Sequence, residues 1–242
     1  MSSASTQWLL VTDIDDTLLG GDDCDFQRLV ESVEATEELS IVLNSSRPYE
    51  SVMRTVREFP RGFSPDGFIT AMGTEIWIEK PITEWSEAFG NWNRSIVDQI
   101  MADLGAKPHA DEFQTPFKAS FAVSAELQDR AREAIQAALP SQIIASGESD
   151  FDVLPPEAGK GAATLKVAEM FSIDPNRQLL VAGDSKNDLA MFEVCPRGIL
   201  VGNARAELRD AVDPNRSYQA SAPQAAGILE GLRHWVVKIH QP

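Results

Sequence analysis

The sequence WLLVTDIDDTLL, residues 8–19, joins a short apolar run to three carboxylates. Residues 8–11 have the continuous apolar character of a strand that is buried on both faces, as in a parallel sheet. Because side chains alternate along a strand, those of Asp13 and Asp15 are expected on the same side. Carboxylates this close repel each other when both are ionised, so a cation, a shared proton or bulk water must relieve them. We interpret this strand end as a functional site and consider magnesium and phosphate its candidate ligands.

Two further apolar runs end in the same way. Residues 39–43 lead into the polar turn NSSR at 44–47, and residues 178–182 lead into GDSKND at 183–188. Apolar residues at helical spacing separate the runs, which is typical of βαβ units. Open parallel sheets bind ligands at the carboxyl ends of their strands. We therefore predict an α/β fold whose parallel sheet gathers these turns at one edge.

The character of the sequence changes between residues 81 and 156. Aromatic residues become frequent, and helical stripes alternate with predicted strands near 119–123 and 142–146. Helices and antiparallel strands in this order indicate an α+β domain inserted into the first one. The predicted domains are thus a core made of 1–80 and 157–242, and a lid made of 81–156.

Composition and charge argue against several classes of function. The chain has 21 basic and 37 acidic residues, a net charge of -16, which opposes non-specific binding to nucleic acid or anionic lipid. No run of about 18 apolar residues occurs, and Cys24 and Cys195 have neither the number nor the spacing of a disulfide framework or zinc site. We expect a cytoplasmic monomer that binds a small molecule, with no nucleic acid and no membrane as partner.

Four motifs resemble those of the haloacid dehalogenase (HAD) superfamily: DIDDT at 13–17, the turn at 44–47, Lys160-Gly161, and GDSKND at 183–188. They occur in the superfamily's order, and the insertion after the second motif is similar to a C2-type cap. More narrowly, three stretches resemble the sucrose-phosphate phosphatase family: AMGTEI at 71–76, the pair Phe117-Lys118, and DVLPPEAGKGAAT at 152–164. The resemblance covers nearly the whole chain and implies a Rossmann-like parallel-sheet core with an inserted α+β cap.

The resemblance also implies roles for single residues. Asp13 would be the nucleophile that forms an aspartyl-phosphate, and Asp15 the general acid and base. The Mg²⁺ ligands would be Asp13, the backbone carbonyl of Asp15, Asp184 and Asp188. The phosphate would be bound by Ser45, Ser46, Lys160 and Asn187, although the family usually has glycine at the position of Ser46.

Other residues carry weaker signals. Arg47, Glu75 and Lys118 are candidate contacts for the sugar, and for Glu75 and Lys118 an ordinary surface salt bridge is the alternative. Several more are expected to be structural: Asp16, Asp22 and Asp23 as solvent-facing turn residues, His109, His234 and His240 at the surface, and Trp85 and Trp92 in the core of the lid.

These observations favour a Mg²⁺-dependent phosphatase that acts on a sugar phosphate, with sucrose 6-phosphate as the first candidate substrate. Mannosylfructose phosphate and mannosyl-3-phosphoglycerate remain alternatives, because cap residues that the motifs do not fix select the sugar. A phosphomutase could use the same acid and base. A non-enzymatic sensor of a phosphorylated ligand is a further alternative, since fold alone does not establish activity.

Overall fold

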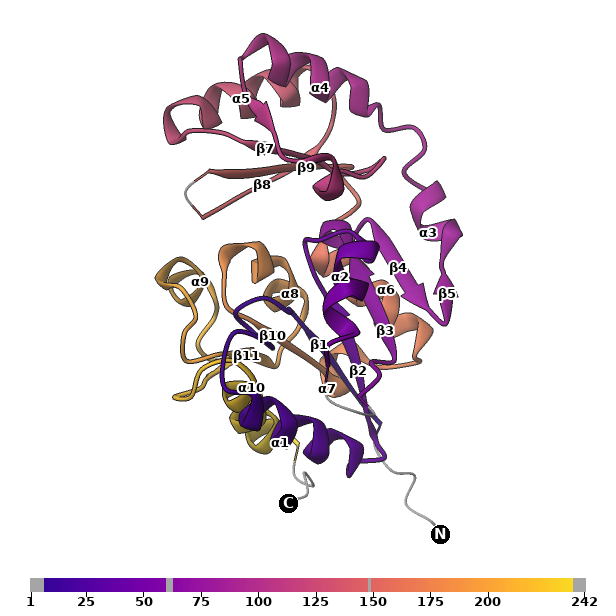
Figure 1. Cartoon of the computed structure of the whole chain (residues 1–242), viewed down its shortest axis with the longest axis vertical. Helices are drawn as coiled ribbons and strands as arrows, with labels where there is room; N and C mark the ends of the chain where they lie inside the picture. Colours follow the sequence, from indigo (N-terminus) through magenta and orange to yellow (C-terminus); the bar gives the residue numbers. More distant parts are fainter. Residues whose placement is uncertain (1–6, 60–62, 148, 237–242) are drawn as a thin grey trace.

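The computed structural model describes residues 7–59, 63–147 and 149–236, so His240 lies outside the described residues. Figure 1 shows two layered parts, a core below and a smaller cap above it. Within the described residues, an eight-stranded sheet forms the centre of the core and a four-stranded sheet that of the cap. The predicted fold class, α/β with a parallel sheet in the core, is confirmed.

The core sheet has the strand order β12-β11-β10-β1-β2-β3-β4-β5, and its strands are parallel from β12 to β3 and antiparallel at β4 and β5. Its strands are β1 (Trp8–Thr12), β2 (Leu39–Asn44), β3 (Gly67–Thr70), β4 (Glu75–Ile78), β5 (Lys80–Pro81), β10 (Leu179–Gly183), β11 (Gly198–Leu200) and β12 (Ser217–Gln219). The chain runs outward from β1 to β3 and later returns to the other side of β1 with β10. The strand order therefore reverses between β1 and β10, which is where sheets of this type form a ligand crevice.

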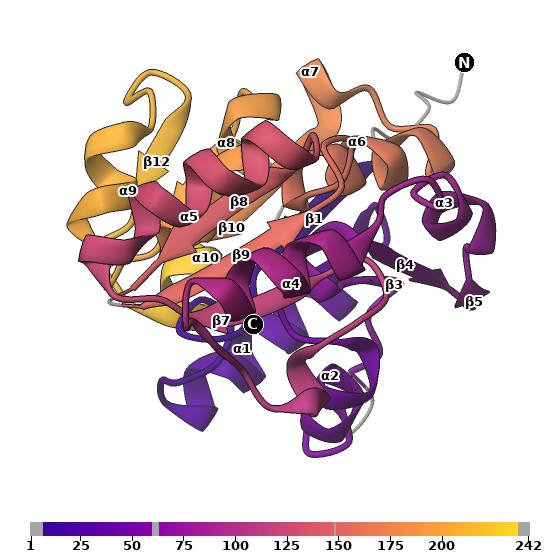
Figure 2. The same ribbon diagram turned by 90° about the horizontal axis from the view of Figure 1, so that it is seen from above.

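Helices cover both faces of this sheet, so its strands are buried and apolar, as the sequence predicts. Leu9, Leu10 and Val11 of β1 have no exposed surface. Figure 2 shows α1 and α10 on one face and α6 and α8 on the other. The core helices are α1 (Asp23–Glu34), α2 (Tyr49–Val56), α6 (Lys160–Met170), α7 (Pro175–Gln178), α8 (Leu189–Val194), α9 (Ala206–Ala211) and α10 (Gln224–Trp235).

The cap sheet is antiparallel and has the order β6-β7-β9-β8. Its elements are α4 (Arg94–Asp103), β6 (Lys107–Pro108), β7 (Ala119–Ala122), α5 (Ala125–Ala138), β8 (Gln142–Ser146) and β9 (Asp150–Leu154). The helices α4 and α5 lie on the outer face, so the inner face of the sheet is turned toward the core (Figures 1 and 2). In β9 the side chains alternate, with Phe151 and Val153 in the apolar cluster below the helices and Asp150 and Asp152 on the inner face.

The predicted lid boundary at residue 81 falls inside β5, which pairs with β4 of the core sheet. The following helix α3 (Thr83–Glu87) also contacts β4. Trp85 was predicted in the core of the lid, and this is wrong: its Nε1 donates to the carbonyl of Gly73 at 3.0 Å, beside the junction of the two parts. Trp92 does lie in the cap cluster and is 8% exposed. The aromatic residues that are frequent between 81 and 156 therefore lie both at the junction of core and cap and in the cap itself.

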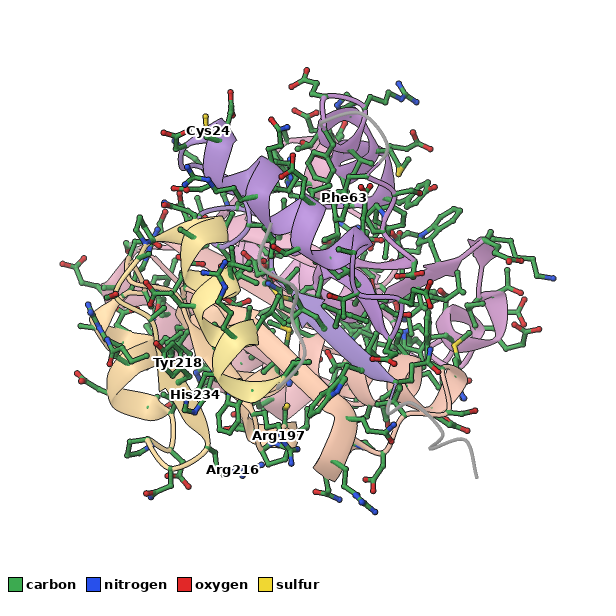
Figure 3. All side chains as sticks on the ribbon, turned by 90° about the horizontal axis from the view of Figure 1, so that it is seen from below. Cys24, Phe63, Arg197, Arg216, Tyr218 and His234 are labelled. Carbon is green, nitrogen blue, oxygen red and sulfur yellow. The ribbon has the colours of Figure 1, made fainter. Side chains whose placement is uncertain are left out.

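Figure 3 shows the face of the core away from the cap, with labelled residues that are not among the candidate site residues. His234 is exposed there and stacks on Tyr218 with 4.6 Å between ring centroids, which confirms a surface position. Cys24 is exposed and Cys195 is buried, and both are free thiols. Among the described residues, no helix combines the length and apolarity that a membrane span requires.

A substitution at Gly73 tests how closely the turns that contain Gly73 and Gly159 approach each other. Its φ is +89°, and a Cβ there would lie 2.3 Å from the backbone of Gly159. Gly105 has a similar φ of +73°, but, its chain neighbours apart, no heavy atom of the described residues lies within 4 Å of the place that a Cβ would take there. Both alanine variants incur the backbone cost of about 1–2 kcal/mol, but Gly73→Ala adds overpacking of about 1–3 kcal/mol. Denaturant unfolding should show this extra loss for Gly73→Ala, and equal losses in the two variants would contradict the close contact.

Candidate active site

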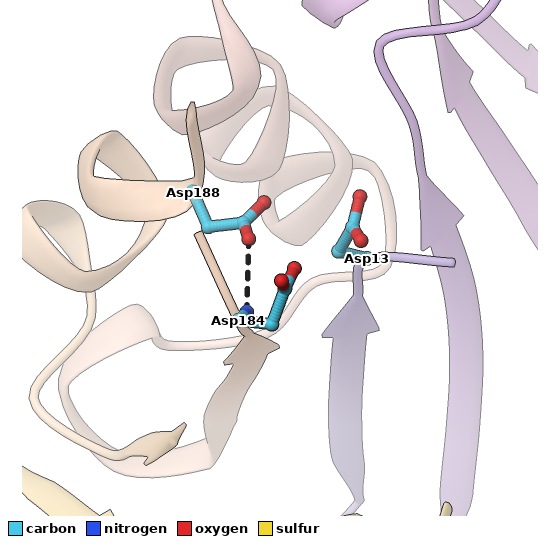
Figure 4. Close-up of side chains that lie close together, drawn as sticks. All are labelled: Asp13, Asp184 and Asp188. Carbon is cyan, nitrogen blue, oxygen red and sulfur yellow. Dashed lines mark hydrogen bonds between the residues drawn. The ribbon is translucent and has the colours of Figure 1, made fainter. Parts of the chain in front are cut away.

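Three buried carboxylates meet at the reversal point of the core sheet. Asp13 follows β1, Asp184 follows β10, and Asp188 ends the short 3₁₀ helix η3 (Lys186–Asp188). Each offers an oxygen within 4.8 Å of the others. Figure 4 shows the three side chains close together. The register of the sheet explains the meeting of the first two, because the backbone N–H of Asp13 donates to Ala182 of β10 at 3.0 Å.

Asp188 is held in place by the turn that carries it. Its Oδ2 accepts hydrogen bonds from the backbone N–H groups of Asp184 at 3.1 Å (Figure 4) and Ser185 at 3.2 Å. On the other side of the cluster, the hydroxyl of Thr17 donates to Asp184 Oδ1 at 3.2 Å. Sequence reasoning did not select Thr17 as a site residue, although it stands inside the DIDDT motif.

Lys160 is the buried cation of the site. Its Nζ lies 2.6 Å from Asp13 Oδ1, 2.6 Å from Asp188 Oδ1 and 3.1 Å from Asn187 Oδ1. An ammonium group has three hydrogens, so each has an acceptor. The amide of Asn44, at the end of β2, donates to the Lys160 carbonyl at 3.2 Å and to Thr164 at 3.3 Å, and thereby fixes the first turn of α6.

Burial and mutual repulsion shift the protonation of these groups. Loss of solvent by itself lowers the pKa of Lys160, but the carboxylates of Asp13 and Asp188 outweigh it, so the pKa is raised. Loss of solvent is also the largest effect on Asp13 and raises its pKa, and the Lys160 ammonium opposes that rise. Burial, reinforced by Asp188, raises the pKa of Asp184 to about 6.

The cluster fits a divalent cation. When ionised, its three carboxylates carry one negative charge each, and Lys160 offsets one of them, which leaves two uncompensated. The guanidinium of Arg205 is 4.0 Å from Asp184, and its side chain is 52% exposed. Carboxylate oxygens are also the hard ligands that divalent cations such as Mg²⁺ and Ca²⁺ prefer. Asp13, Asp184 and Asp188 are therefore the residues that could hold such an ion.

Asp15 lies in different surroundings from Asp13. The strand β1 ends at Thr12, so the alternation of a strand does not extend over the acidic turn. The side chain of Asp13 is 8% exposed and that of Asp15 is 58% exposed. The carboxylate of Asp15 pairs with Arg47 at 2.9 Å, between Oδ2 and Nε. Asp16, as expected, is an exposed turn residue with a φ of +59°.

The polar turn after β2 lies at the same edge of the sheet. Ser45 is buried, and its hydroxyl oxygen accepts a hydrogen bond from the Arg47 backbone at 3.1 Å. Ser46 and Arg47 line a cavity between core and cap, together with Met72 and Asn187.

The cap supplies the other wall of this cavity with polar side chains. Lys118 is 3% exposed, and its Nζ lies 3.3 Å from Asp152 Oδ1 and donates to the Phe113 carbonyl at 3.1 Å. Ser120 donates to the same Asp152 oxygen. His109 pairs with Asp150 at 3.2 Å. The alternative of a surface salt bridge for Lys118 is wrong, because the pair is buried in the cavity wall.

The other residues that the sequence analysis discussed differ in whether they line this cavity. Glu75 does not line it: its carboxylate accepts from the Thr70 hydroxyl at 2.7 Å and faces the N-terminus of α2 through Tyr49 N at 3.4 Å. His109 was predicted at the surface, yet it is half-buried and lines the cavity. Asp152 and Ser120 were missed as well. The alternation of DFDVL in β9 was the available signal for Asp150 and Asp152.

The shift of Asp184 predicts a pH dependence of stability in the cation-free protein. Its pKa is about 6 when folded and 3.8 as an ordinary value, so the folded state binds the extra proton between these limits. The contribution of Asp184 to stability therefore falls as pH rises from about 4 to about 6, by at most about 3 kcal/mol, and Asp13, whose pKa burial raises to about 8, adds a fall of its own. Thermal unfolding in chelator should show this fall, and a divalent cation should stabilise the protein more at about pH 7.5 than at about pH 5.

Asp184→Asn is the control for that measurement, because it removes the titrating group and keeps the shape. The variant should lose the part of the pH dependence that belongs to Asp184, keep the part that belongs to Asp13, and lose most of the stabilisation by the cation. An unchanged pH dependence in the variant would contradict the assignment to Asp184.

Known proteins resemble this chain over nearly its full length. A family model described as sucrose-6F-phosphate phosphohydrolase matches residues 6–236. Mannosylfructose-phosphate phosphatase of Agrobacterium fabrum is 31% identical over 94% of this chain and 96% of its own length. Probable sucrose-phosphatase 2 of Arabidopsis thaliana is 29% identical over 94% of this chain, which spans 59% of that protein.

Solved structures agree with this grouping. The X-ray structure of the sucrose-phosphatase from Synechocystis, in complex with sucrose and phosphate, has a TM-score of 0.87 at 30% identity and covers 96% of this chain and 98% of its own. A sugar phosphatase of HAD subclass IIB has a TM-score of 0.73 at 18% identity, covers 96% of this chain and 100% of its own, and shows the fold alone. The chain thus belongs to the sucrose-6F-phosphate phosphohydrolase family of HAD-type phosphatases, which are phosphoric monoester hydrolases.

Proposed function

We propose that this phosphatase hydrolyses the phosphate ester of a neutral disaccharide, with sucrose 6-phosphate as the first candidate, and that Mg²⁺ is its cation. The observation that carries the proposal is a cavity with polar cap side chains on one wall and Ser46, Arg47 and Asn187 of the core on the other. Asn187 connects this cavity to the buried carboxylates, because its Oδ1 lies 3.1 Å from Lys160 Nζ. The cap wall is the proposed sugar end, and the buried cluster of Asp13, Lys160, Asp184 and Asp188 is the proposed phosphate end.

The first half-reaction transfers the phosphoryl group to the protein. A carboxylate oxygen of Asp13 attacks phosphorus, the bond from phosphorus to the sugar oxygen breaks, and Asp15 donates a proton to that oxygen. Lys160 holds Asp13 in place through its 2.6 Å contact and offsets negative charge beside it. Bound Mg²⁺, held by Asp13, Asp184, Asp188 and the Asp15 carbonyl, would supply further stabilisation of phosphoryl charge.

The second half-reaction restores the protein. Asp15, now a carboxylate, takes a proton from a water molecule as this water attacks phosphorus. The bond between phosphorus and the Asp13 oxygen breaks, and inorganic phosphate leaves. Ser45, Ser46 and Asn187 are the proposed hydrogen-bond donors to the phosphate, since they lie at the same edge of the sheet.

The side chains of the cap wall favour a substrate whose leaving group is an uncharged sugar. It presents the carboxylates of Asp150 and Asp152, the hydroxyl of Ser120 and the ammonium of Lys118, which is already paired with Asp152. Donors and acceptors side by side suit sugar hydroxyls, which both donate and accept. The carboxylate of mannosyl-3-phosphoglycerate would instead lie beside two carboxylates, of which Lys118 offsets only one. This argument favours sucrose 6-phosphate and mannosylfructose phosphate over that third substrate.

A substrate panel tests the function. Phosphate release should be measured as kcat/KM on sucrose 6-phosphate, mannosylfructose phosphate, mannosyl-3-phosphoglycerate and simple hexose phosphates, with Mg²⁺ and with EDTA. We expect a neutral disaccharide phosphate to give the highest value and EDTA to abolish turnover. Binding of a sugar phosphate without phosphate release would favour a non-enzymatic sensor, and formation of an isomeric sugar phosphate would favour a phosphomutase. A preference for mannosyl-3-phosphoglycerate would contradict the argument from the charges of the cap wall.

The nucleophile has a matched control within the same turn. Asp13→Asn should lower kcat by roughly 10³-fold or more, because an amide cannot form the aspartyl-phosphate. Asp16→Asn makes the same chemical change three residues on, at an exposed position, and should stay within about twofold of the unmodified chain. Full activity of Asp13→Asn, measured on the best substrate of the panel, would exclude the aspartyl-phosphate.

A further inference from the structure

Arg47 links a residue of the site to a residue outside it. Its Nε lies 2.9 Å from Asp15 Oδ2, and one terminal nitrogen donates to the hydroxyl of Thr55 at 2.9 Å. Thr55 lies in the last turn of α2 and does not line the cavity. The guanidinium is therefore held between the acidic turn after β1 and a helix on the flank of the core.

The backbone of Arg47 is fixed at both of its polar groups. Its N–H donates to the Ser45 hydroxyl oxygen at 3.1 Å, and its carbonyl accepts from the N–H of Ala71 at 2.8 Å. The Arg47 side chain is 20% exposed. With backbone and guanidinium both held, the planar donor group has one defined place, which a flexible lysine at this position would lack.

Asp15, in contrast, has little else to hold it. Its side chain is 58% exposed, and within 7–59, 63–147 and 149–236 Arg47 is the one ion-pair partner of its carboxylate. A general acid must stand within hydrogen-bond reach of the oxygen that it protonates, and a small misplacement lowers the rate. An exposed carboxylate with several rotamers would meet this requirement only part of the time.

We propose that Arg47 and Thr55 form a positioning pair for Asp15: the Thr55 hydroxyl orients the guanidinium, and the guanidinium holds the Asp15 carboxylate in its working place. The proposal rests on the proposed function, in which Asp15 is the acid and base. The contact engages Oδ2 and leaves Oδ1 to carry the proton. Nε and Oδ2 lie 2.9 Å apart, so the guanidinium stays beside the same oxygen in both half-reactions, whether or not Oδ1 carries the proton.

The test uses the leaving group to separate positioning from structure. The quantity kcat/KM reports the steps up to release of the alcohol, in which Asp15 protonates the leaving oxygen. A sugar oxygen needs that proton, whereas p-nitrophenolate leaves readily without it. Loss of the positioning pair should therefore lower kcat/KM for the sugar phosphate and spare kcat/KM for p-nitrophenyl phosphate.

Thr55→Val keeps the shape of the side chain and removes the acceptor, so kcat/KM for the best sugar phosphate should fall by about fivefold to tenfold, the effect of one lost hydrogen bond. The value for p-nitrophenyl phosphate should stay within about twofold. Thr55→Ser restores the hydroxyl and should restore the activity. Equal losses on both substrates, no loss on either, or no rescue by serine would overturn the proposal.

Two further variants complete the experiment. If Thr55→Val does not fold, as judged by thermal unfolding, Thr55→Ala replaces it, and the same difference between the two substrates is expected. Asp15→Asn serves as the reference and should show that difference at its largest. If Asp15→Asn spares both substrates, the role of Asp15 in the proposed function fails, and the positioning pair fails with it. If Asp15→Asn behaves as expected and Thr55→Val does not, the pair alone fails.

Discussion

The ammonium of Lys160 is withdrawn from solvent, and a buried charge is tolerated when opposite charges pair with it and acceptors bind its hydrogens. Asp13, Asp188 and Asn187 meet both conditions, and they come from segments as much as 147 positions away from Lys160. The carboxyl ends of β1 and β10 and the N-terminus of α6 must therefore come together for the cation to be buried. The contact between Gly73 and Gly159 follows from the same requirement, since it allows the turn before α6 to reach the sheet edge.

In the proposed function, the core acts on the phosphate of the ester and the cap binds its sugar. The core gathers carboxylates at the reversal point of a parallel sheet, a place set by topology. The fold itself is shared with a structure at only 18% identity. The cap adds a polar wall from the inner face of its sheet, where Ser120, Asp150 and Asp152 line the cavity. Selection of the sugar is proposed to lie in that wall, because fold alone does not determine a substrate.

Asp13 and Asp15 have identical side chains, but their positions give them different burial and different charged partners. The first lies at the end of a buried strand against a buried lysine, and the second lies two residues on, exposed and paired with an arginine. The proposed roles use this difference, since a nucleophile is best held rigidly among fixed charges and a general acid must reach a leaving oxygen. Arg47 gives the exposed carboxylate a partner without burying it.

Local patterns in the sequence were sufficient to predict the parallel α/β core, the inserted α+β cap and the acidic strand ends, because apolar runs, helical spacing and turn residues are properties of neighbouring positions. The partners of single side chains were not predictable in this way. Lys118 meets Asp152, His109 faces the cavity, Glu75 turns away from it, and Arg47 reaches Thr55 and Asp15. These contacts depend on how strands and helices far apart in the chain pack against each other, so only the tertiary structure decided them.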